Sequence, residues 1–186
     1  PLILEKSKFW DFLEHKAEAW QKQAYLRSRI LGKQQSYFQK DFELVRINNE
    51  ERKSLEEILS KLLIKPLKNQ IDLKNCEGGI IHTEFVIQKL CLLGENPPQS
   101  SATKDILETL KIGANDKELL LQNYFELRKF EQTFQICNDT SSTKVAGQNF
   151  HLERLSKILG YEDAFKRLGD LVGEQQALLK RLDLNH

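Results

Sequence analysis

The sequence predicts an all-α protein, a bundle of about eight helices with no sheet. Nearly every segment repeats its apolar residues at intervals of three and four, and no segment sustains the alternation typical of a strand. Glycine or proline follows most of these apolar runs, and serine or asparagine precedes several of them. The chain has 186 residues, of which 40% are hydrophobic and 30% are charged. This length and composition are typical of one well-cored globular domain.

Capping and breaking residues set the expected bounds of each helix. Ser7 is a suitable N-cap for the first helix, and Gly32 directly follows its last residue. Pro66 comes soon after the third helix, Gly79 opens the fourth, and the loop ENPPQSSAT precedes the fifth. In order, we expect helices at residues 7–31, 35–47, 50–63, 79–94, 103–112, 116–137, 150–159 and 162–182.

The polar stretch NDTSSTKVAGQ divides the predicted bundle. It has few apolar residues that could anchor it to a core, so we expect a mobile connector at residues 138–148. The main helical bundle is then expected over residues 1–137. A C-terminal helical pair, residues 149–186, would pack on or beside it.

The charge balance excludes several classes of partner. Lys and Arg total 28 against 27 for Asp and Glu, a formal net charge of +1, which gives no general reason to expect nucleic acid or anionic lipid. No apolar stretch is long enough to span a bilayer, and no signal peptide is recognisable, so we expect a cytoplasmic protein. The three cysteines are widely spaced and the four histidines stand alone. We therefore expect free thiols and no metal site.

Three predicted helices place a charged residue where their repeat calls for an apolar one: Arg27, Glu84 and Glu131. A charge that faces a core is unfavourable unless it is paired and hydrogen-bonded. We therefore hypothesise a buried polar cluster that joins Arg27 to Glu84 or Glu131, with Arg29 and Arg128 close enough to contribute. In the alternative, the helices turn these side chains to the edge of the seam, where their long stems reach water. A catalytic role is the least favoured alternative, because nothing nearby resembles a triad.

The stretch CEGGIIHTEF places two glycines at the start of the fourth helix. In one interpretation, the N–H groups of Gly78 and Gly79, with Asp72 and Lys74 beside them, face a nucleotide or a neighbouring domain. In the other, glycine permits a turn with positive φ and close packing, which positions Glu84 in the cluster. We favour the structural interpretation, because a glycine pair that opens a helix is commoner than an anion site.

Four blocks in one order carry a family resemblance: AEAWQKQAYLRSRIL, IDLKNCEGGIIHTEFVIQKL, DILETL and YFELRKFEQTFQ. Together they resemble the helical domain of the glutamine synthetase adenylyltransferase family. In that family a nucleotidyltransferase-fold catalytic domain precedes a helical bundle, and the arrangement occurs twice in one chain. One half attaches AMP to glutamine synthetase, and the other removes it by phosphorolysis. The resemblance spans about residues 1–136, and the final helices fit more loosely.

The resemblance rests on particular positions. Gln132 departs from it, since the family often has His there, and so do His82 and Thr83 before the motif's glutamate. The matching positions are Trp20, Ala24, Arg27, Ser28 and Arg29 in the first motif; Asp72, Lys74, Gly78, Gly79, Ile80, Glu84 and Phe85 in the second; and Tyr124, Leu127, Arg128, Glu131, Phe134 and Gln135 in the third.

This resemblance implies a regulatory or docking domain of a bifunctional enzyme that controls nitrogen assimilation. Such a domain would complete the nucleotide cleft of its own nucleotidyltransferase domain and contact glutamine synthetase, with the PII signal protein as a further candidate partner. The carboxylates that hold magnesium beside ATP lie in the preceding domain of the family. We therefore expect no catalytic residue and no cofactor in this chain, and ATP and Mg in the parent enzyme.

Two other functions compete with this one. The first is a stand-alone helical protein-interaction module without nucleotide chemistry. It is disfavoured because the chain begins PLILEKSKFW and contains no methionine, so we expect a piece of a longer protein. The second is a nucleic-acid-binding bundle that uses KQAYLRSRILGK. A net charge of +1 makes it the weakest candidate.

Overall fold

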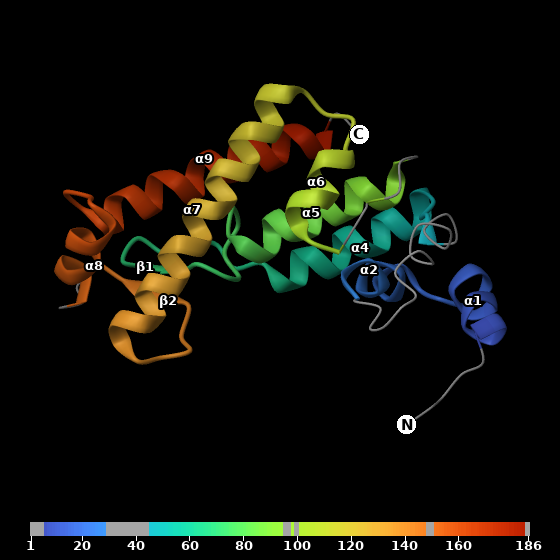
Figure 1. Cartoon of the computed structure of the whole chain (residues 1–186), viewed down its shortest axis with the longest axis horizontal. Coiled ribbons are helices and arrows are strands. Elements are labelled where there is room, and N and C mark those ends of the chain that lie inside the picture. The colour runs from blue at the N-terminus through green and yellow to red at the C-terminus, as the bar shows by residue number, and fades with distance from the viewer. Residues whose placement is uncertain (1–5, 29–44, 95–97, 99–100, 148–150, 185–186) are drawn as a thin grey trace. The chain divides into compact units, whose positions relative to one another are not determined.

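The computed structural model describes residues 6–28, 45–94, 98, 101–147 and 151–184, and these are mostly helical (Figure 1). Most of the predicted helix at residues 35–47 lies outside the described residues. The elements in chain order are α1 (Lys6–His15), α2 (Ala19–Arg27), α4 (Asn49–Leu62), β1 (Gln70–Asp72), α5 (Ile80–Leu93), α6 (Thr103–Thr109), α7 (Ala114–Asn138), β2 (Lys144–Ala146), α8 (His151–Leu159) and α9 (Ala164–Leu184).

Contacts group the chain into two compact units. Unit 1 comprises Pro1–Ser60 and Ile87–Lys111, and unit 2 comprises Lys61–Val86 and Ile112–His186. Each unit therefore draws on two separate stretches of sequence. This grouping does not test whether residues 1–137, 138–148 and 149–186 behave as separate parts, so that division stays a prediction.

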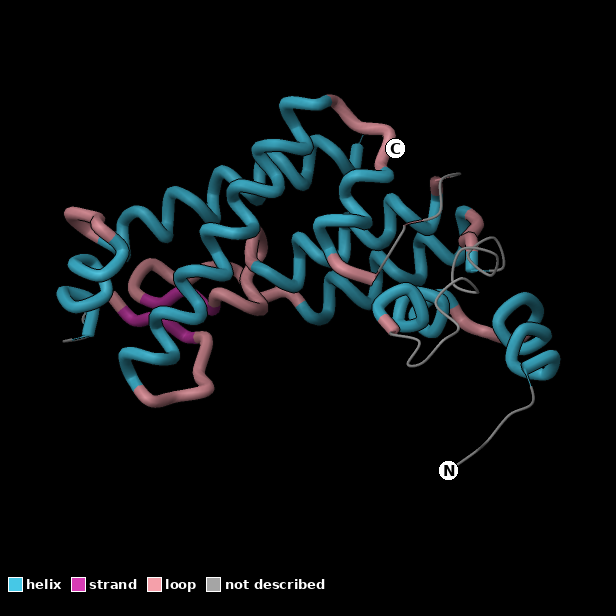
Figure 2. The backbone as a smooth tube through the Cα atoms, in the orientation of Figure 1, coloured by secondary structure: helices cyan, strands magenta, loops and turns pink. Residues whose placement is uncertain are grey.

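The prediction of an all-α bundle without a sheet is wrong. β1 and β2 form a two-stranded antiparallel sheet (Figure 2). In this sheet Ile71 lies opposite Val145. Both of these side chains are buried, and the N–H of Leu73 donates to the carbonyl of Thr143 at 2.9 Å beyond the end of the ladder. β1 lies between the helices predicted at 50–63 and 79–94, and β2 lies in the connector predicted at 138–148. Each is three residues long, which is too short to show a period of two.

The predicted helix at residues 7–31 is divided into α1 and α2. The N–H groups of Lys16 and Ala17 both donate to the carbonyl of Phe12, which ends α1. Glu18 is extended, and its N–H donates to the side chain of Gln21 at 2.8 Å as α2 begins. This is a capping box with glutamate at the first position in place of the usual serine or threonine, which makes it hard to recognise from the residues alone.

Most other helices start and stop close to their predicted bounds. α4 and α5 match the third and fourth predicted helices to within one residue at each end. α8 ends at Leu159, and Gly160 follows it with a φ of +78°, as a C-terminal stop requires. α7 begins at Ala114, two residues before the predicted helix at 116–137, and Gly113 is its N-cap residue.

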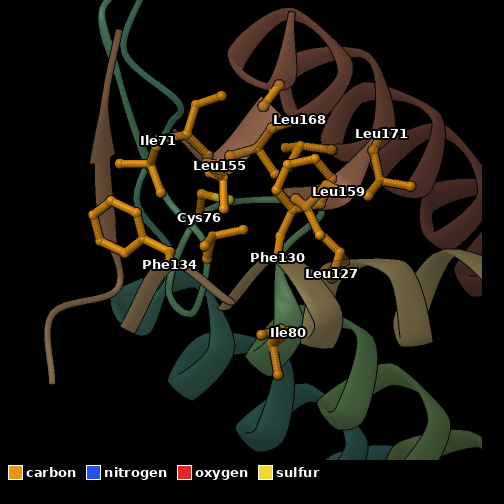
Figure 3. Packing of buried hydrophobic residues seen from close by; sticks show 14 of the residues in the cluster. Ile71, Cys76, Ile80, Leu127, Phe130, Phe134, Leu155, Leu159, Leu168 and Leu171 are labelled. Atoms are coloured by element: carbon orange, nitrogen blue, oxygen red, sulfur yellow. The ribbon is translucent and has the colours of Figure 1, made fainter. Parts of the chain in front are cut away.

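In unit 2, α7 is the central element of the core. It packs against α8 and α9, and the buried side chains of Ile71 and Cys76 also belong to this core (Figure 3). The ring of Tyr161 stacks on Phe130 with 5.5 Å between centroids and 4° between planes. α7 and α9 run antiparallel. Arg167, near the start of α9, pairs with Glu126 in the middle of α7, and Arg181, near the end of α9, pairs with Asp116 near the start of α7. The apolar part of α7 in this core comprises Tyr124, Leu127, Phe130 and Phe134.

In unit 1, two buried lysines are held by glutamates of α4. The ammonium of Lys22 lies 2.7 Å from a carboxylate oxygen of Glu51, and that of Lys89 lies 3.0 Å from Glu56. Lys89 is fully buried. A buried ammonium group is tolerated there because its charge is paired.

Within the described part of the chain, no helix is both long and apolar enough to cross a membrane.

Candidate functional site

Two features of unit 2 contain the residues that the second and third motifs single out. We call residues 72–79 the glycine corner. We call Glu84, Tyr124, Arg128 and Glu131 the Arg128 cluster. α5 connects them, because it begins directly after the corner and carries Glu84 one turn later.

Asp72 organises the glycine corner from its first position. One carboxylate oxygen accepts the N–H groups of Lys74 and Asn75, both at 3.1 Å, and the hydroxyl of Thr143 at 2.8 Å. Burial would raise the pKa of this carboxyl, but the hydrogen bonds from Asn75 and Thr143 outweigh it and hold the pKa below its ordinary value. Asp72 therefore stays ionised and closes the turn that leads to the glycines, while Thr143 ties it to the segment before β2.

Both glycines are required by close packing. Gly78 has a φ of +82°, and a Cβ there would lie 2.2 Å from the carbonyl oxygen of Val172 on α9. A Cβ on Gly79 would lie 2.7 Å from the carbonyl oxygen of Leu73 and 2.9 Å from that of Cys76. Real Cβ atoms do not approach carbonyl oxygens so closely, so no other residue fits either position without movement of the backbone.

The N–H groups at the start of α5 are already used within the chain. Gly78 donates to Nδ1 of His82 at 2.9 Å. The N–H groups of Gly79, Ile80 and Ile81 donate to backbone carbonyls of the same corner at 2.9 to 3.0 Å. A phosphate at this helix start would have to displace these acceptors, so the geometry gives the glycines a packing role.

α9 holds the glycine corner through side chains as well. The amide of Gln175 donates to the hydroxyl of Thr83 at 2.9 Å, and that hydroxyl donates to the carbonyl of Gly79 at 2.9 Å. Gln176 pairs with Glu77 at the edge of the corner. Gln175 and Thr83 are fully buried, so this connection is internal to unit 2.

The Arg128 cluster joins α5 to α7 across 44 residues of sequence. Nη2 of Arg128 donates to Glu84 at 2.6 Å, and Nη1 donates to Glu131 at 2.8 Å. The hydroxyl of Tyr124 donates to the same oxygen of Glu84 at 2.7 Å and accepts from Nε of Arg128 at 3.2 Å. One guanidinium therefore forms ion pairs with two buried carboxylates.

The surroundings of Arg128 favour its charged form. Burial disfavours the guanidinium of Arg128, but its hydrogen bonds to Tyr124 and Glu131 and the charge of Glu84 raise its pKa above the ordinary value. The guanidinium also lies over the ring of Tyr124, 5.5 Å from its centroid. A group that is charged at every accessible pH and holds two carboxylates can brace helices, but it cannot exchange protons in catalysis.

The structure places the predicted site residues in different surroundings. It brings together Glu84, Arg128 and Glu131. Arg27 is the last residue of α2 in unit 1, and its pairing with either glutamate stays a prediction. Arg29 lies outside the described residues.

The four residues predicted to face a nucleotide or a neighbouring domain also differ from one another. Asp72, Gly78 and Gly79 are buried. Only Lys74 is exposed. An interdomain role for these residues stays a prediction, and Lys74 is the member whose side chain is open to a partner.

One further ionic group of unit 2 was missed in the sequence. Arg167 on α9 donates from Nε and Nη2 to the two carboxylate oxygens of Glu126 on α7, at 2.8 and 2.7 Å. The hydroxyl of Tyr161 donates to Glu126 at 2.7 Å. Burial alone would raise the pKa of the Glu126 carboxyl, but the bonds from Arg167 and Tyr161 hold it below its ordinary value. Glu126 is not on the apolar seam of its helix, so no local pattern pointed to this contact.

The described residues include no group of three or more His, Cys, Asp or Glu side chains placed to hold a metal ion. Burial raises the pKa of the thiols of Cys76 and Cys91 to about 12. Both thiols are free and stay protonated at neutral pH, so they are poor nucleophiles.

Comparison with known proteins places these features in a family context. Residues 50–182 match the family model described as GlnD PII-uridylyltransferase. The chain is also 25% identical, over 182 residues, to the bifunctional glutamine synthetase adenylyltransferase/adenylyl-removing enzyme of Psychromonas ingrahamii. That alignment covers 88% of this chain and 19% of the Psychromonas protein, so the chain spans less than a quarter of the length of this relative. The glycine corner and the Arg128 cluster both lie within the matched residues.

Proposed function

Because the chain belongs to the GlnD PII-uridylyltransferase family, we propose that it forms a helical, non-catalytic module of a nucleotidyltransferase. The reaction we propose for the parent protein is the transfer of AMP from ATP to glutamine synthetase, and its reversal. The similarity to the Psychromonas adenylyltransferase over 88% of the chain supports this choice. The module would serve the control of nitrogen assimilation as a regulatory or docking domain.

One observation carries the proposal: two of the family-like motifs meet in a single framework. Glu84 from the second motif and Arg128 from the third form an ion pair at 2.6 Å, and the glycines of the second motif fit against α9. Residues that brace α5, α7 and α9 in this way support a scaffold role. A catalytic role would instead leave a carboxylate or a base open to substrate.

The charged groups that nucleotidyl transfer needs would then come from another part of the parent protein. ATP and Mg would be held there, next to this module, which would complete the nucleotide cleft. Lys74 is exposed beside the glycine corner, where its side chain is open to a partner. Glutamine synthetase is the proposed protein substrate. The PII signal protein is a proposed regulator.

A second candidate reaction follows from the description of the family model. The name PII-uridylyltransferase points to transfer of UMP to PII, with UTP as donor. The two reactions share their chemistry and differ in nucleotide and protein substrate. This module fits either parent, because a scaffold supplies neither reacting group.

The natural protein that carries this chain provides the test. It is incubated with radiolabelled ATP, Mg and glutamine synthetase in one reaction, and with radiolabelled UTP, Mg and PII in another. Label on glutamine synthetase is the expected result. Label on PII alone would replace the proposed reaction with the second candidate. No label on either protein would contradict a nucleotidyltransferase parent and favour a stand-alone interaction module.

A further inference from the structure

A short segment of unit 2 combines exposed apolar side chains with lysines. Leu62, Ile64 and Leu67 are 48%, 49% and 60% exposed. Of the nine large hydrophobic side chains that are exposed in the described part of the chain, these three lie within six residues of each other. Single exposed apolar side chains are normal on a protein surface, but a local group of them indicates an interaction site.

Four exposed lysines lie along this segment or next to its contact with the glycine corner. Lys61, Lys65 and Lys68 alternate with them along the chain, and all three are exposed. Lys74 is exposed as well, and it precedes Asn75, whose carbonyl accepts the N–H of Ile64 at 2.9 Å. Among the described residues, none of these lysines has a carboxylate within ion-pair distance, although the chain as a whole is nearly neutral.

The backbone of this segment is held in place before any partner arrives. The N–H of Glu77 donates to the carbonyl of Ile64 at 3.0 Å, which completes a bridge with the glycine corner. Leu67 and Gln70 close a tight turn through hydrogen bonds of 3.0 and 3.2 Å. Pro66 fixes φ between these two anchors. A surface that is already ordered loses little conformational entropy on binding.

We propose that residues 61–68, together with Lys74, form a docking surface for an acidic segment of a protein partner. The carboxylates of that segment would pair with the four lysines, and its apolar side chains would cover Leu62, Ile64 and Leu67. Complementary charge of this kind selects the partner and speeds its association, while the apolar contacts supply affinity.

The chemistry of the surface favours an acidic polypeptide over the other polyanions. Single-stranded nucleic acid is held by aromatic side chains that stack on bases, and residues 61–78 contain no Phe, Trp or Tyr. An anionic membrane is bound by an amphipathic helix that lies in its surface. Beyond the end of α4 at Leu62, this segment is not helical.

The proposal is independent of the nucleotide that the parent protein transfers. It concerns binding alone, and it can be tested without ATP, UTP or either protein substrate. Failure of the binding test therefore leaves the proposed reaction standing. Failure of the labelling test likewise leaves the docking surface standing.

The test measures binding of a fluorescent synthetic peptide of Asp, Glu and Leu to the whole chain by anisotropy. We expect saturable binding that weakens as salt is added. The variant Lys65→Glu/Lys68→Glu should bind at least about tenfold more weakly, because two ion pairs become repulsive contacts. Leu67→Ser should weaken binding severalfold at every salt concentration, because it removes apolar contact and no charge.

The matched control is Lys157→Glu/Lys180→Glu, which changes the net charge equally on the exposed faces of α8 and α9. It should bind the peptide like the unchanged chain. Equal weakening by both double variants would mean that only net charge matters, and it would overturn the proposal. Absence of peptide binding would also overturn it, as would tighter binding to oligothymidylate or to phosphatidylserine vesicles that the same lysine reversal abolishes.

Discussion

Two glycines of unit 2 differ in whether the structure leaves room for a side chain. Gly78 has a positive φ, and a Cβ there would collide with the carbonyl oxygen of Val172. Gly173 lies in the middle of α9, and a Cβ there meets nothing within 4 Å. The glycine pair at the start of α5 could be recognised in the sequence as a turn or a close approach. The sequence could not identify Val172, 94 residues further on, as the residue that approaches Gly78 so closely.

Alanine at these two positions should therefore have opposite effects. We expect Gly78→Ala to reduce the free energy of unfolding by about 2–4 kcal/mol, because strain at positive φ adds to the clash. Gly173→Ala should raise it by up to about 1 kcal/mol, because alanine is the better helix former. Urea unfolding followed by circular dichroism measures both. Equal stability of the two variants would contradict the packing role of the corner.

A charged residue at an apolar position of a helix was an informative signal in this sequence. Glu84 and Glu131 each interrupt an apolar stripe, and the structure places both against Arg128. The pattern could not select Arg128 over Arg27 or Arg29 as the partner of Glu84. Spacing on one helix does not determine how a second helix is rotated toward it.

At the scale of elements, α7 and α9 are joined by an ion pair that depends on pH. Glu126 accepts two hydrogen bonds from Arg167 and one from Tyr161. Its pKa is lower in the folded protein than the ordinary value of 4.5. Because the pKa of this carboxyl is lowered by folding, the ion pair stabilises the folded protein fully at pH values above the ordinary pKa. This stabilisation is lost as the pH falls through the pKa of the carboxyl in the folded protein.

Glu126→Gln should accordingly destabilise the chain by about 2 kcal/mol at neutral pH, because hydrogen bonds to a charged acceptor are lost. The difference from the unchanged chain should shrink as the pH falls from about 5 toward 3. Urea unfolding at a series of pH values measures this difference. Glu153→Gln, on an exposed position of α8, is the control and should change little at any pH. A difference that stays constant with pH would contradict the account of this contact.

The short strands and the break between α1 and α2 could not be predicted from the sequence. The positions of α4, α5, α8 and α9 followed from apolar periodicity and from the residues that stop a helix. β1 and β2 did not, because three residues carry no measurable period and their pairing joins Ile71 to Val145 across 74 residues. The break between α1 and α2 was also missed, since a glutamate at the N-cap is a weaker signal than serine or threonine.

At the scale of the whole molecule, the family could be recognised because several motifs occur in one order. The second and third motifs stand at places where the fold requires particular residues: Asp72 for a turn, the glycines for a close approach, Arg128 for two buried carboxylates. The sequence could not predict that each compact unit combines two separate stretches of the chain. That grouping arises from contacts between segments far apart in sequence, such as α5 and α9.

The most direct test of the central claim is a double-mutant cycle between Glu84 and Arg128, because this pair joins two family-like motifs inside unit 2. The variants Glu84→Gln, Arg128→Met and their combination are compared by the free energy of unfolding. If the two motifs stabilise the fold through this pair, the effects of the two substitutions on the free energy of unfolding should be coupled by about 1–3 kcal/mol. If the effects add to within about 0.5 kcal/mol, the motifs do not brace the fold through this pair, and their role must lie elsewhere.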